Sequence, residues 1–249
     1  MVLAAGQGRR LARMGHTGPK WLAGVAGRPI AAYQLDAVRL ALPPTTPLVV
    51  VGGHRFEELR AWLAVGATGM RLELVENPAY AELNNWYSLL MATRHLDAMA
   101  WPGPTVILNS DLCATPSWFQ AFLAFVGEGL PSEGALAVDL ARRLTDEAMK
   151  VSLDSHRVCR GIGKVGVADP GGEYVGMAAV TEKGRALLTA ALEEFVDDSS
   201  RGDDWYEAAF QLLMDRHRLF TAWPTPDSRW VEIDDEADWA QASELMAKT

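Results

Sequence analysis

The sequence has few cysteines, little positive charge and no long hydrophobic run, and each scarcity excludes a class of protein. Cysteine occurs twice in 249 residues, at Cys113 and Cys159, without the spacing of a metal site. Two free thiols in a reducing compartment are therefore expected. The formal net charge of -9 argues against a nucleic-acid binder or a membrane-surface protein. No apolar run approaches the roughly 20 residues that a membrane span needs.

The remaining composition is that of an ordinary globular protein. Hydrophobic residues make up 49% and charged residues 22% of the chain, and a chain of this length can bury a sizeable core. An apolar strand follows Met1 directly, without the basic region and cleavage site of a secretory signal. Together with the two thiols, this pattern predicts a cytoplasmic protein.

The pattern of apolar residues changes about halfway along the chain. Up to about residue 130, predicted strands at 2–5, 48–51, 71–75 and 105–108 alternate with predicted helices at 29–42, 56–65, 85–98 and 116–126. This alternation predicts a doubly wound, mostly parallel α/β sheet. Strands then predominate, at 135–139, 149–153, 158–161 and 175–180, before helices at 182–195, 205–217 and 236–246 and a strand in RWVEID. We interpret 1–249 as a single domain whose second part, about 131–249, adds a smaller mixed β region.

The first predicted strand runs into a glycine-rich, basic loop, GQGRRL, which PKW follows. Gly6 and Gly8 allow backbone N–H groups to approach a phosphate closely, and ligands of open α/β sheets bind beyond the carboxyl ends of strands. Positive charge in the same stretch comes from four side chains: Arg9, Arg10, Arg13 and Lys20. A solvated surface turn would have a similar composition. The spacing fits neither G-x-G-x-x-G nor G-x-x-x-x-G-K-[ST].

Two aspartates that are far apart in the sequence follow predicted strands. Asp111 comes after TVILN, and Asp234 ends the strand in RWVEID. Mg²⁺ on a nucleotide takes few protein oxygens and keeps its phosphate and water ligands, so two such carboxylates can hold it. Turn formation would also explain an aspartate at these positions. Asp235 is the rival for the second metal position, although its spacing suits a helix cap better.

The string LAAGQGRRL…PKWL resembles the signature L-A-A-G-x-G-x-R-L, followed by P-K, of the nucleotidyltransferases. This family transfers a nucleotidyl group from an NTP to a phosphorylated acceptor. The resemblance extends to NSD, which ends at Asp111, and to EID, which ends at Asp234. It implies a Rossmann-like, GT-A-type fold with a nucleotide-binding half over about 1–130 and an acceptor-binding half over about 131–249. Arg9 departs from the family, which has a small Ser or Thr there.

The same resemblance implies roles for individual residues. Catalysis falls to Lys20, Arg10, Asp111 and Asp234, and Mg²⁺ on the two aspartates is the implied cofactor. The triphosphate and nucleotide are lined by the first strand and its loop: Leu3, Ala5, Gly6 and Gly8. An acceptor phosphate is already ionised near neutral pH, so positioning and charge neutralisation suffice without a general base. As a loop residue, Lys20 is expected to contribute little to stability.

The stretch NPAYAELNNWYSLLMA points to the nucleotide. It resembles the NP-x-Y-x-x-x-NN-x-x-SL pattern of the cytidylyltransferases for phosphocholine and related phosphonates, as does DEAMKVSLD…GIGK…GGEYVGMAAVTEKG downstream. Side chains of Asn84, Asn85 and Ser88 can recognise the edge of cytosine, or simply cap a helix. CTP is therefore the predicted nucleotide, and a small phosphate or phosphonate compound is the predicted acceptor.

Residues of the second half are candidates for binding the acceptor. Lys150, in EAMKV, is the predicted cation for its phosphate; Lys164, in GIGK, is a second candidate that an exposed strand lysine explains equally well. Trp205 and Tyr206, in DDWYE, can hold an ammonium group by cation–π attraction, or belong to the core. Further pocket candidates are Glu147, Glu173, Tyr174, Asp203 and Asp204.

Three other functions remain open at the level of sequence. A sugar-1-phosphate nucleotidyltransferase that uses UTP or dTTP would carry the same loop and aspartates. A metal-dependent glycosyltransferase would explain NSD but leave Lys20 and the glycine loop unexplained. A non-catalytic nucleotide-binding protein would not need both aspartates and Lys20. The sequence determines neither the acceptor nor the oligomeric state.

Overall fold

The first half of the chain builds a parallel sheet, as predicted. The computed structural model describes residues 1–13 and 15–248. Its parallel strands are β1 (Val2–Ala4), β4 (Pro47–Gly52), β5 (Arg71–Glu76) and β6 (Thr105–Asn109). β1 pairs with β4 and β6, and β4 pairs with β5, all in parallel register. Their continuous apolar runs suit a sheet that is covered on both faces.

The second half extends the same sheet with mostly antiparallel strands. These are β8 (Gly134–Asp139), β9 (Lys150–Leu153), β10 (Cys159–Gly163), β11 (Pro170–Val180) and β12 (Phe220–Pro224). Within the part of the chain that the structure describes, the sheet has nine strands, with the path β10-β9-β11-β6-β1-β4-β5, while β8 pairs with β11 and β12. β11 joins the two halves, because it is antiparallel to β6 from the first half and to β8 and β9 from the second. The short run FTAWP of β12 was not predicted as a strand.

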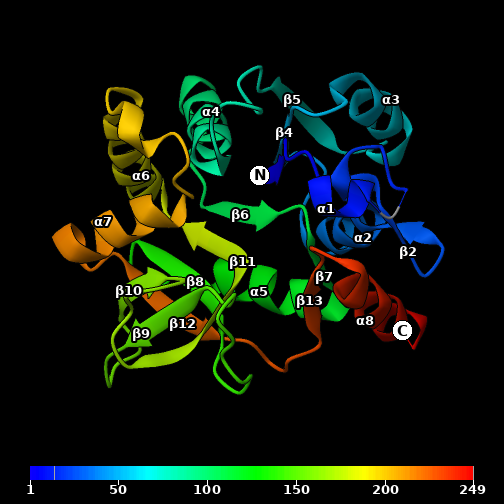
Figure 1. Cartoon of the computed structure of the whole chain (residues 1–249). Helices are drawn as coiled ribbons and strands as arrows, with labels where there is room; N and C mark the ends of the chain where they lie inside the picture. The colour runs from blue at the N-terminus through cyan, green and yellow to red at the C-terminus, as the bar shows by residue number, and fades with distance from the viewer. Residues whose placement is uncertain (14, 249) are drawn as a thin grey trace.

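Helices cover both faces of this sheet (Figure 1). Alternate residues of the strands face opposite sides, so that Leu3 and Ile107 belong to one apolar cluster and Val2 and Leu108 to another. The first cluster is covered by α4 (Asn85–Ala98), α6 (Glu182–Val196) and α7 (Glu207–His217). The second is covered by α2 (Ile30–Ala41), α3 (Phe56–Gly66), α5 (Pro116–Glu128) and α8 (Glu236–Ala247). The predicted doubly wound α/β architecture is therefore confirmed.

Helix starts follow the capping residues in the sequence. The side chains of Asn84, Thr115 and Thr181 accept hydrogen bonds from the first turns of α4, α5 and α6. Asp235 caps α8 within a capping box that Asp238 completes, which agrees with the predicted cap. Among the described residues, no helix combines the length and the apolar character that crossing a membrane requires.

Several short elements escaped sequence patterns. They are α1 (Arg9–Ala12), two 3₁₀ turns at Lys20–Leu22 and Ser199–Arg201, the hairpin of β2 (Gly24–Val25) and β3 (Arg28–Pro29), and β7 (Leu112–Ala114). The predicted strand in RWVEID is confirmed as β13 (Trp230–Glu232), which pairs with β7 in a separate ladder. The antiparallel β7–β13 ladder matters most, because it brings the end of the chain beside β6. Local propensity cannot predict this pairing of two three-residue strands.

One glycine fixes the shape of β11 where the halves meet. Gly176 has φ +77°, and the register of β11 against β8 shifts around it. A Cβ there would lie 2.9 Å from Nδ2 of Asn109, the last residue of β6. Only glycine combines this conformation with so close an approach.

Replacing Gly176 with alanine should therefore destabilise the protein by about 1–3 kcal/mol, through backbone strain and the clash with Asn109. Urea unfolding measures this. The matched control is Gly127→Ala in α5, where a new Cβ meets no described atom within 4 Å. That change should be neutral or stabilise by about 0.5–1 kcal/mol. Equal effects of the two substitutions would contradict the strain that we assign to Gly176.

Candidate active site

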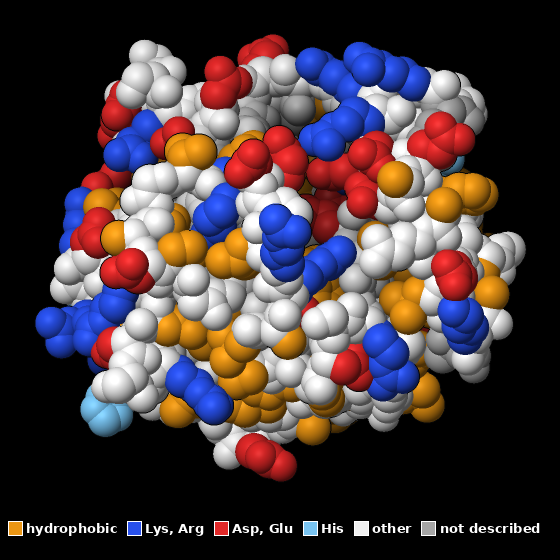
Figure 2. Space-filling model, turned by 60° about the horizontal axis from the view of Figure 1, so that its bottom comes forward, with side chains coloured by type: hydrophobic (Ala, Val, Ile, Leu, Met, Phe, Trp, Pro, Cys, Tyr) orange, Lys and Arg blue, Asp and Glu red, His pale blue; other side chains and the backbone are white. Residues whose placement is uncertain are grey.

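A cavity of about 770 Å³ opens beyond the carboxyl ends of β1 and β6. Its walls come from the glycine loop, the start of α4, the ends of β6 and β13, the start of α7 and the segment around Lys164. Acidic side chains outnumber basic ones among its lining residues. Figure 2 shows acidic side chains gathered in a hollow of this face, with lysine and arginine side chains close to it.

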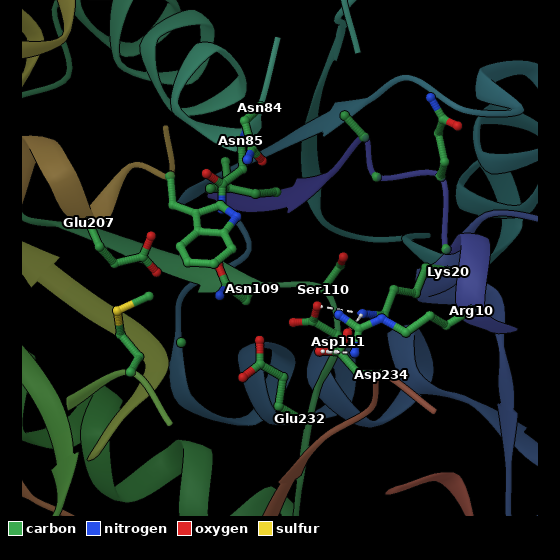
Figure 3. A pocket seen from close by; sticks show the side chains of 18 of the residues that line it. Arg10, Lys20, Asn84, Asn85, Asn109, Ser110, Asp111, Glu207, Glu232 and Asp234 are labelled. Carbon is green, nitrogen blue, oxygen red and sulfur yellow. Dashed lines mark hydrogen bonds and ion pairs between the residues drawn. The ribbon is translucent and has the colours of Figure 1, made fainter. Parts of the chain in front are cut away.

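Lys20 joins the two predicted aspartates at one end of this cavity (Figure 3). Its Nζ donates to Asp111 Oδ2 and to Asp234 Oδ1, both at 2.8 Å. Arg10 approaches Asp234 Oδ2 at 3.4 Å. The side chain of Lys20 is only 12% exposed. The four residues implied to be catalytic thus lie together, although they come from three distant parts of the chain.

The β7–β13 ladder produces this meeting of aspartates. Asp111 lies in the tight turn between β6 and β7, and Asp234 follows β13. The backbone N–H of Ile233 donates to the carbonyl of Asp111 at 3.0 Å, which sets the two segments side by side. The backbone N–H of Asp234 donates to Asp238 at 3.0 Å, so the start of α8 holds the second aspartate from the other side.

The charged groups in this cluster shift one another's pKa values. Burial alone would lower the pKa of Lys20, but Asp111 and Asp234 outweigh it and hold that pKa above its ordinary value. Burial would raise the pKa of Asp234, but the charge and hydrogen bond of Lys20 lower it below its ordinary value. Lys20 therefore remains cationic and Asp234 anionic at neutral pH. The expectation that Lys20 contributes little to stability assumed an exposed loop residue, whereas its side chain is largely buried between two carboxylates.

The cluster also has the donor set that a magnesium ion prefers. Two carboxylates converge on one cation, the ammonium of Lys20. Asp111 Oδ1 is buried and has no hydrogen-bond partner among the described residues. Within the described residues no group of three or more His, Cys, Asp or Glu is arranged to hold a metal by itself. Two protein oxygens with room for phosphate and water ligands fit Mg²⁺ on a nucleotide.

The glycine loop packs against Lys20. Gly8 has φ +56° and precedes α1 directly, and a Cβ on it would lie 3.3 Å from Cβ of Lys20. Gly6 leaves open space, with no described atom within 4 Å of an added Cβ. Leu3, Ala5, Gly6 and Gly8 all line the cavity. The loop therefore presents its backbone to the cavity beside the lysine.

The polar residues predicted to recognise a base line the cavity but also hold the protein together. Asn84 caps α4, and its Nδ2 donates to the carbonyl of Asp203 at 2.9 Å. Asn85 Oδ1 accepts from the backbone N–H of Tyr206 at 2.9 Å. Ser88 is buried and accepts from Asn77. These contacts tie the start of α4 to the segment before α7.

The predicted acceptor residues divide into two groups. Glu147, Glu173, Trp205 and Lys164 line the cavity. Lys164 lies over the ring of Trp205, with Nζ 4.5 Å from the ring centroid, and donates to Glu147 at 3.1 Å. Burial raises the pKa of Glu173. The aromatic face of Trp205 is thus already covered by a cation of the protein itself.

Lys150 and Tyr206 are not among the described residues that line the cavity, so the predicted phosphate contact of Lys150 and the pocket position of Tyr206 are not supported. The ammonium of Lys150 is held by backbone carbonyls, of which Lys164 O lies at 2.8 Å. Tyr206 is fully buried, and its hydroxyl donates to Asn109 Oδ1 and accepts from Tyr174. Lys150 thus supports the Lys164 segment, and Tyr206 packs in the core.

The polar residues of the cavity lining that sequence reasoning missed include Asn109, Arg142, Glu207 and Glu232. Glu232 lies two residues before Asp234 in EID, so strand alternation was an available signal for it. The surrounding protein and the charges of Asp111 and Asp234 raise its pKa. Glu207 directly follows DDWY in the sequence, but no local pattern marks it as a cavity residue.

Glu207 is the most deeply buried of these acids. Its side chain points into the cavity from the first turn of α7 (Figure 3), and the residue is only 7% exposed. Oε2 is buried and accepts no hydrogen bond from the residues that the structure describes. Burial raises the pKa of Glu207 to about 7, and the charge of Asp111 adds to the shift.

The fold and this site are those of a nucleotidyltransferase. The family of the MobA-like NTP transferase domain matches residues 1–194. The chain belongs to this family.

Individual relatives agree with this class. The chain is 29% identical over 97% of its length to CMP-5'-(3-aminopropyl)phosphonate synthase of Streptomyces rubellomurinus, and 28% identical over 94% to the bifunctional protein GlmU of Paraburkholderia xenovorans. It spans 38% and 48% of these two relatives, less than half of each.

Solved structures share the fold. The inositol-1-phosphate CTP transferase of T. maritima has a TM-score of 0.78 at 20% identity, covering 98% of this chain and 94% of that one. The CTP:phosphocholine cytidylyltransferase of Streptococcus pneumoniae has a TM-score of 0.76 at 18% identity, covering 98% and 97%. A UDP-glucose pyrophosphorylase has a TM-score of 0.73 at 13% identity, covering 99% and 97%.

Replacing Lys20 with methionine should destabilise the ligand-free protein by about 1–3 kcal/mol, because two converging carboxylates lose the cation between them. Added Mg²⁺ should recover part of this loss by taking its place. Thermal and urea unfolding with and without Mg²⁺ measure both effects.

The matched control is Lys183→Met, which removes an exposed lysine from its pair with Glu133. This change should cost less than about 0.5 kcal/mol and show no response to Mg²⁺. If Lys20→Met is equally mild, or insensitive to Mg²⁺, the cluster is not a cation site.

The raised pKa of Glu207 predicts a dependence of stability on pH. A carboxyl whose folded pKa of about 7 exceeds its ordinary 4.5 binds its proton more tightly when folded. The contribution of Glu207 to the free energy of unfolding therefore falls as pH rises from 4.5 to 7. Across this range the free energy of unfolding of Glu207→Gln should rise relative to that of wild type, by up to about 3 kcal/mol above pH 7, since a pKa unit is worth about 1.4 kcal/mol.

Urea unfolding below pH 4.5 and above pH 7 checks this prediction. Asp215→Asn, on the exposed side of the same helix, is the control and should show no comparable change. A constant difference between Glu207→Gln and wild type at all pH values would contradict it.

Proposed function

We propose that this chain is one nucleotidyltransferase domain, over 1–249, that transfers CMP from CTP to a small phosphate or phosphonate acceptor and releases pyrophosphate. The observation that carries the proposal is the convergence of Asp111 and Asp234 on Lys20 beside the glycine loop. This arrangement suits the binding of a triphosphate and a divalent cation at the end of the cavity that the glycine loop lines.

The chemistry requires little from the protein beyond positioning and charge. An oxygen of the acceptor phosphate or phosphonate attacks the α-phosphorus of CTP, and the bond from that phosphorus to the bridging oxygen of pyrophosphate breaks. A Mg²⁺ ion, bound by Asp111 and Asp234, would neutralise charge on the phosphates. Lys20 and Arg10 hold the departing pyrophosphate. Because the acceptor is already an anion, no proton must be removed from it.

The choice of CTP rests on similarity together with the residues of α4. The stretch with Asn84 and Asn85 resembles the cytidylyltransferase pattern, and both residues line the cavity. A relative that spans the chain is named for a CMP-phosphonate product, and two fold neighbours are named for CTP. In this proposal, amide groups at the start of α4 and the backbone around them recognise the amino and carbonyl edge of cytosine.

The acceptor occupies the opposite end of the cavity from Arg10 in this proposal. Lys164 and Arg142 are the basic residues that the second half of the chain contributes to the cavity wall. Lys164 then takes the role first expected for Lys150, which is to bind the phosphate of the acceptor. Its contacts with Glu147 and Trp205 keep it at the cavity surface until an anionic acceptor arrives.

A sugar-1-phosphate nucleotidyltransferase is the second candidate, since a UDP-glucose pyrophosphorylase shares the fold. Pyrophosphate release should be measured with CTP, UTP and dTTP, each paired with phosphocholine, aminoalkyl and hydroxyalkyl phosphonates, and glucose 1-phosphate. CTP with a phosphocholine-like or phosphonate acceptor should give the highest kcat/KM. A preference for UTP or dTTP with glucose 1-phosphate would establish the second candidate instead.

Asp111→Asn should lower kcat by about 100-fold or more, on the scale of losing one preorganised electrostatic contact. Asp234→Asn should behave similarly. The matched control is Asp235→Asn, which retains a good N-cap residue and should have a much milder effect. Pyrophosphate release, measured beside a melting curve that confirms folding, separates the three. Near-normal turnover in folded Asp111→Asn would exclude Asp111 from the metal site. A larger loss of turnover in Asp235→Asn than in Asp234→Asn would assign the metal to Asp235.

A further inference from the structure

The catalytic scheme above leaves one buried acid without a role. Glu207 lies across the cavity from Lys20 and Arg10 (Figure 3), and its Oε2 is buried without a hydrogen-bond partner among the described residues. A buried carboxylate oxygen that lacks a donor is costly to the folded state. Such an atom in a cavity wall indicates that a donor arrives with a ligand.

The groups around Glu207 define what that donor must be. Asp111 and Glu232 bring negative charge toward it, and the buried side chains of Tyr206 and Tyr174 interact with it. The basic group whose charge acts on Glu207, Lys164, is engaged by Glu147 and the ring of Trp205. The site therefore has an excess of negative charge that a cationic donor would balance.

We propose that Glu207 selects the acceptor by accepting a hydrogen bond from a primary ammonium group at the end opposite its phosphonate or phosphate. The inference rests on the proposed function, because it treats this part of the cavity as the acceptor site. It names the substrate class: acyclic ω-aminoalkyl phosphonates or phosphates, of which 3-aminopropylphosphonate is a suitable probe.

A primary ammonium fits better than a quaternary one. The unpartnered Oε2 requires an N–H or O–H donor, and a trimethylammonium group has neither. The alternative subsite for a quaternary group, the face of Trp205, is covered by Lys164 in this structure. A hydroxyl could donate to Oε2 but would leave the negative charge unbalanced. The structure thus favours an amine over both a choline-type group and an alcohol.

The first measurement compares acceptors in the wild-type protein. With CTP, kcat/KM should be about 10- to 100-fold higher for 3-aminopropylphosphonate than for 3-hydroxypropylphosphonate, the range for a hydrogen bond to a charged group. Phosphocholine should also be poorer than the amine. If the alcohol or phosphocholine equals or exceeds the amine, the proposal is overturned.

The second measurement assigns the preference to Glu207. Glu207→Gln keeps the shape and removes the charge, so the ratio of kcat/KM for the amine to kcat/KM for the alcohol should fall to near one. Glu207→Asp retains the charge on a shorter side chain, and should keep a preference for amines that shifts toward 4-aminobutylphosphonate. Asp215→Asn, outside the cavity on the same helix, should leave the preference unchanged. Retention of the full amine preference in folded Glu207→Gln would overturn the assignment.

Binding without turnover keeps this inference separate from the proposed function. Calorimetric titration with 3-aminopropylphosphonate alone should show affinity for wild type that falls about 10-fold or more in Glu207→Gln. If no nucleotide releases pyrophosphate but this binding difference is present, the proposed function fails and the ammonium site stands. If CTP turns over with other acceptors and the binding difference is absent, the ammonium site fails and the proposed function stands.

Discussion

The ion pairs of Lys20 with Asp111 and Asp234 are the constraint on which the site depends. Each partner belongs to a different part of the chain: the loop after β1, the turn after β6 and the segment after β13. Two partly buried carboxylates this close would repel each other without a cation between them. The parallel sheet supplies two of the three positions, because β1 and β6 are neighbours whose carboxyl ends meet at one edge. The third requires the β7–β13 ladder, which exists only in the folded chain.

The same ion pairs place opposite charges side by side in the cavity wall. Lys20 and Arg10 bring positive charge beside the glycine loop, where Asp111 and Asp234 pair with them, and Glu207 lies across the cavity from them (Figure 3). Under the proposed function and acceptor preference, a protein of net charge -9 holds a polyanion beside the glycine loop and a cationic group at Glu207. β11 contributes to the cavity wall where Gly176 lies against Asn109, since both residues line the cavity. Charge placement, rather than net charge, explains how an acidic protein can serve an anionic ligand.

Local patterns predicted the regular elements because burial and capping act within a few residues. The runs of β4 and β6, the helical spacing of α4 and the cap at Asp235 are all visible in the sequence. The same reasoning could not separate Lys150 from Lys164, which lie close together at one end of the β9–β10 hairpin. A lysine in or beside a strand can face a cavity or the backbone of its neighbours. The pairing of β9 with β10 determines which of these environments each lysine has.

The sequence by itself indicated the fold class and the glycine loop, because these depend on periodicity and short-range spacing, and its resemblance to the nucleotidyltransferase signature indicated Lys20, Asp111 and Asp234. Tertiary structure alone decided that Lys20 is buried between two carboxylates, that Tyr206 is a core residue and that Trp205 is covered by Lys164. It also brought Glu207 to the cavity wall without a partner. These features depend on which distant segments come into contact. The contact removes water from some side chains and brings charged groups close together, and a local stretch of sequence encodes neither effect.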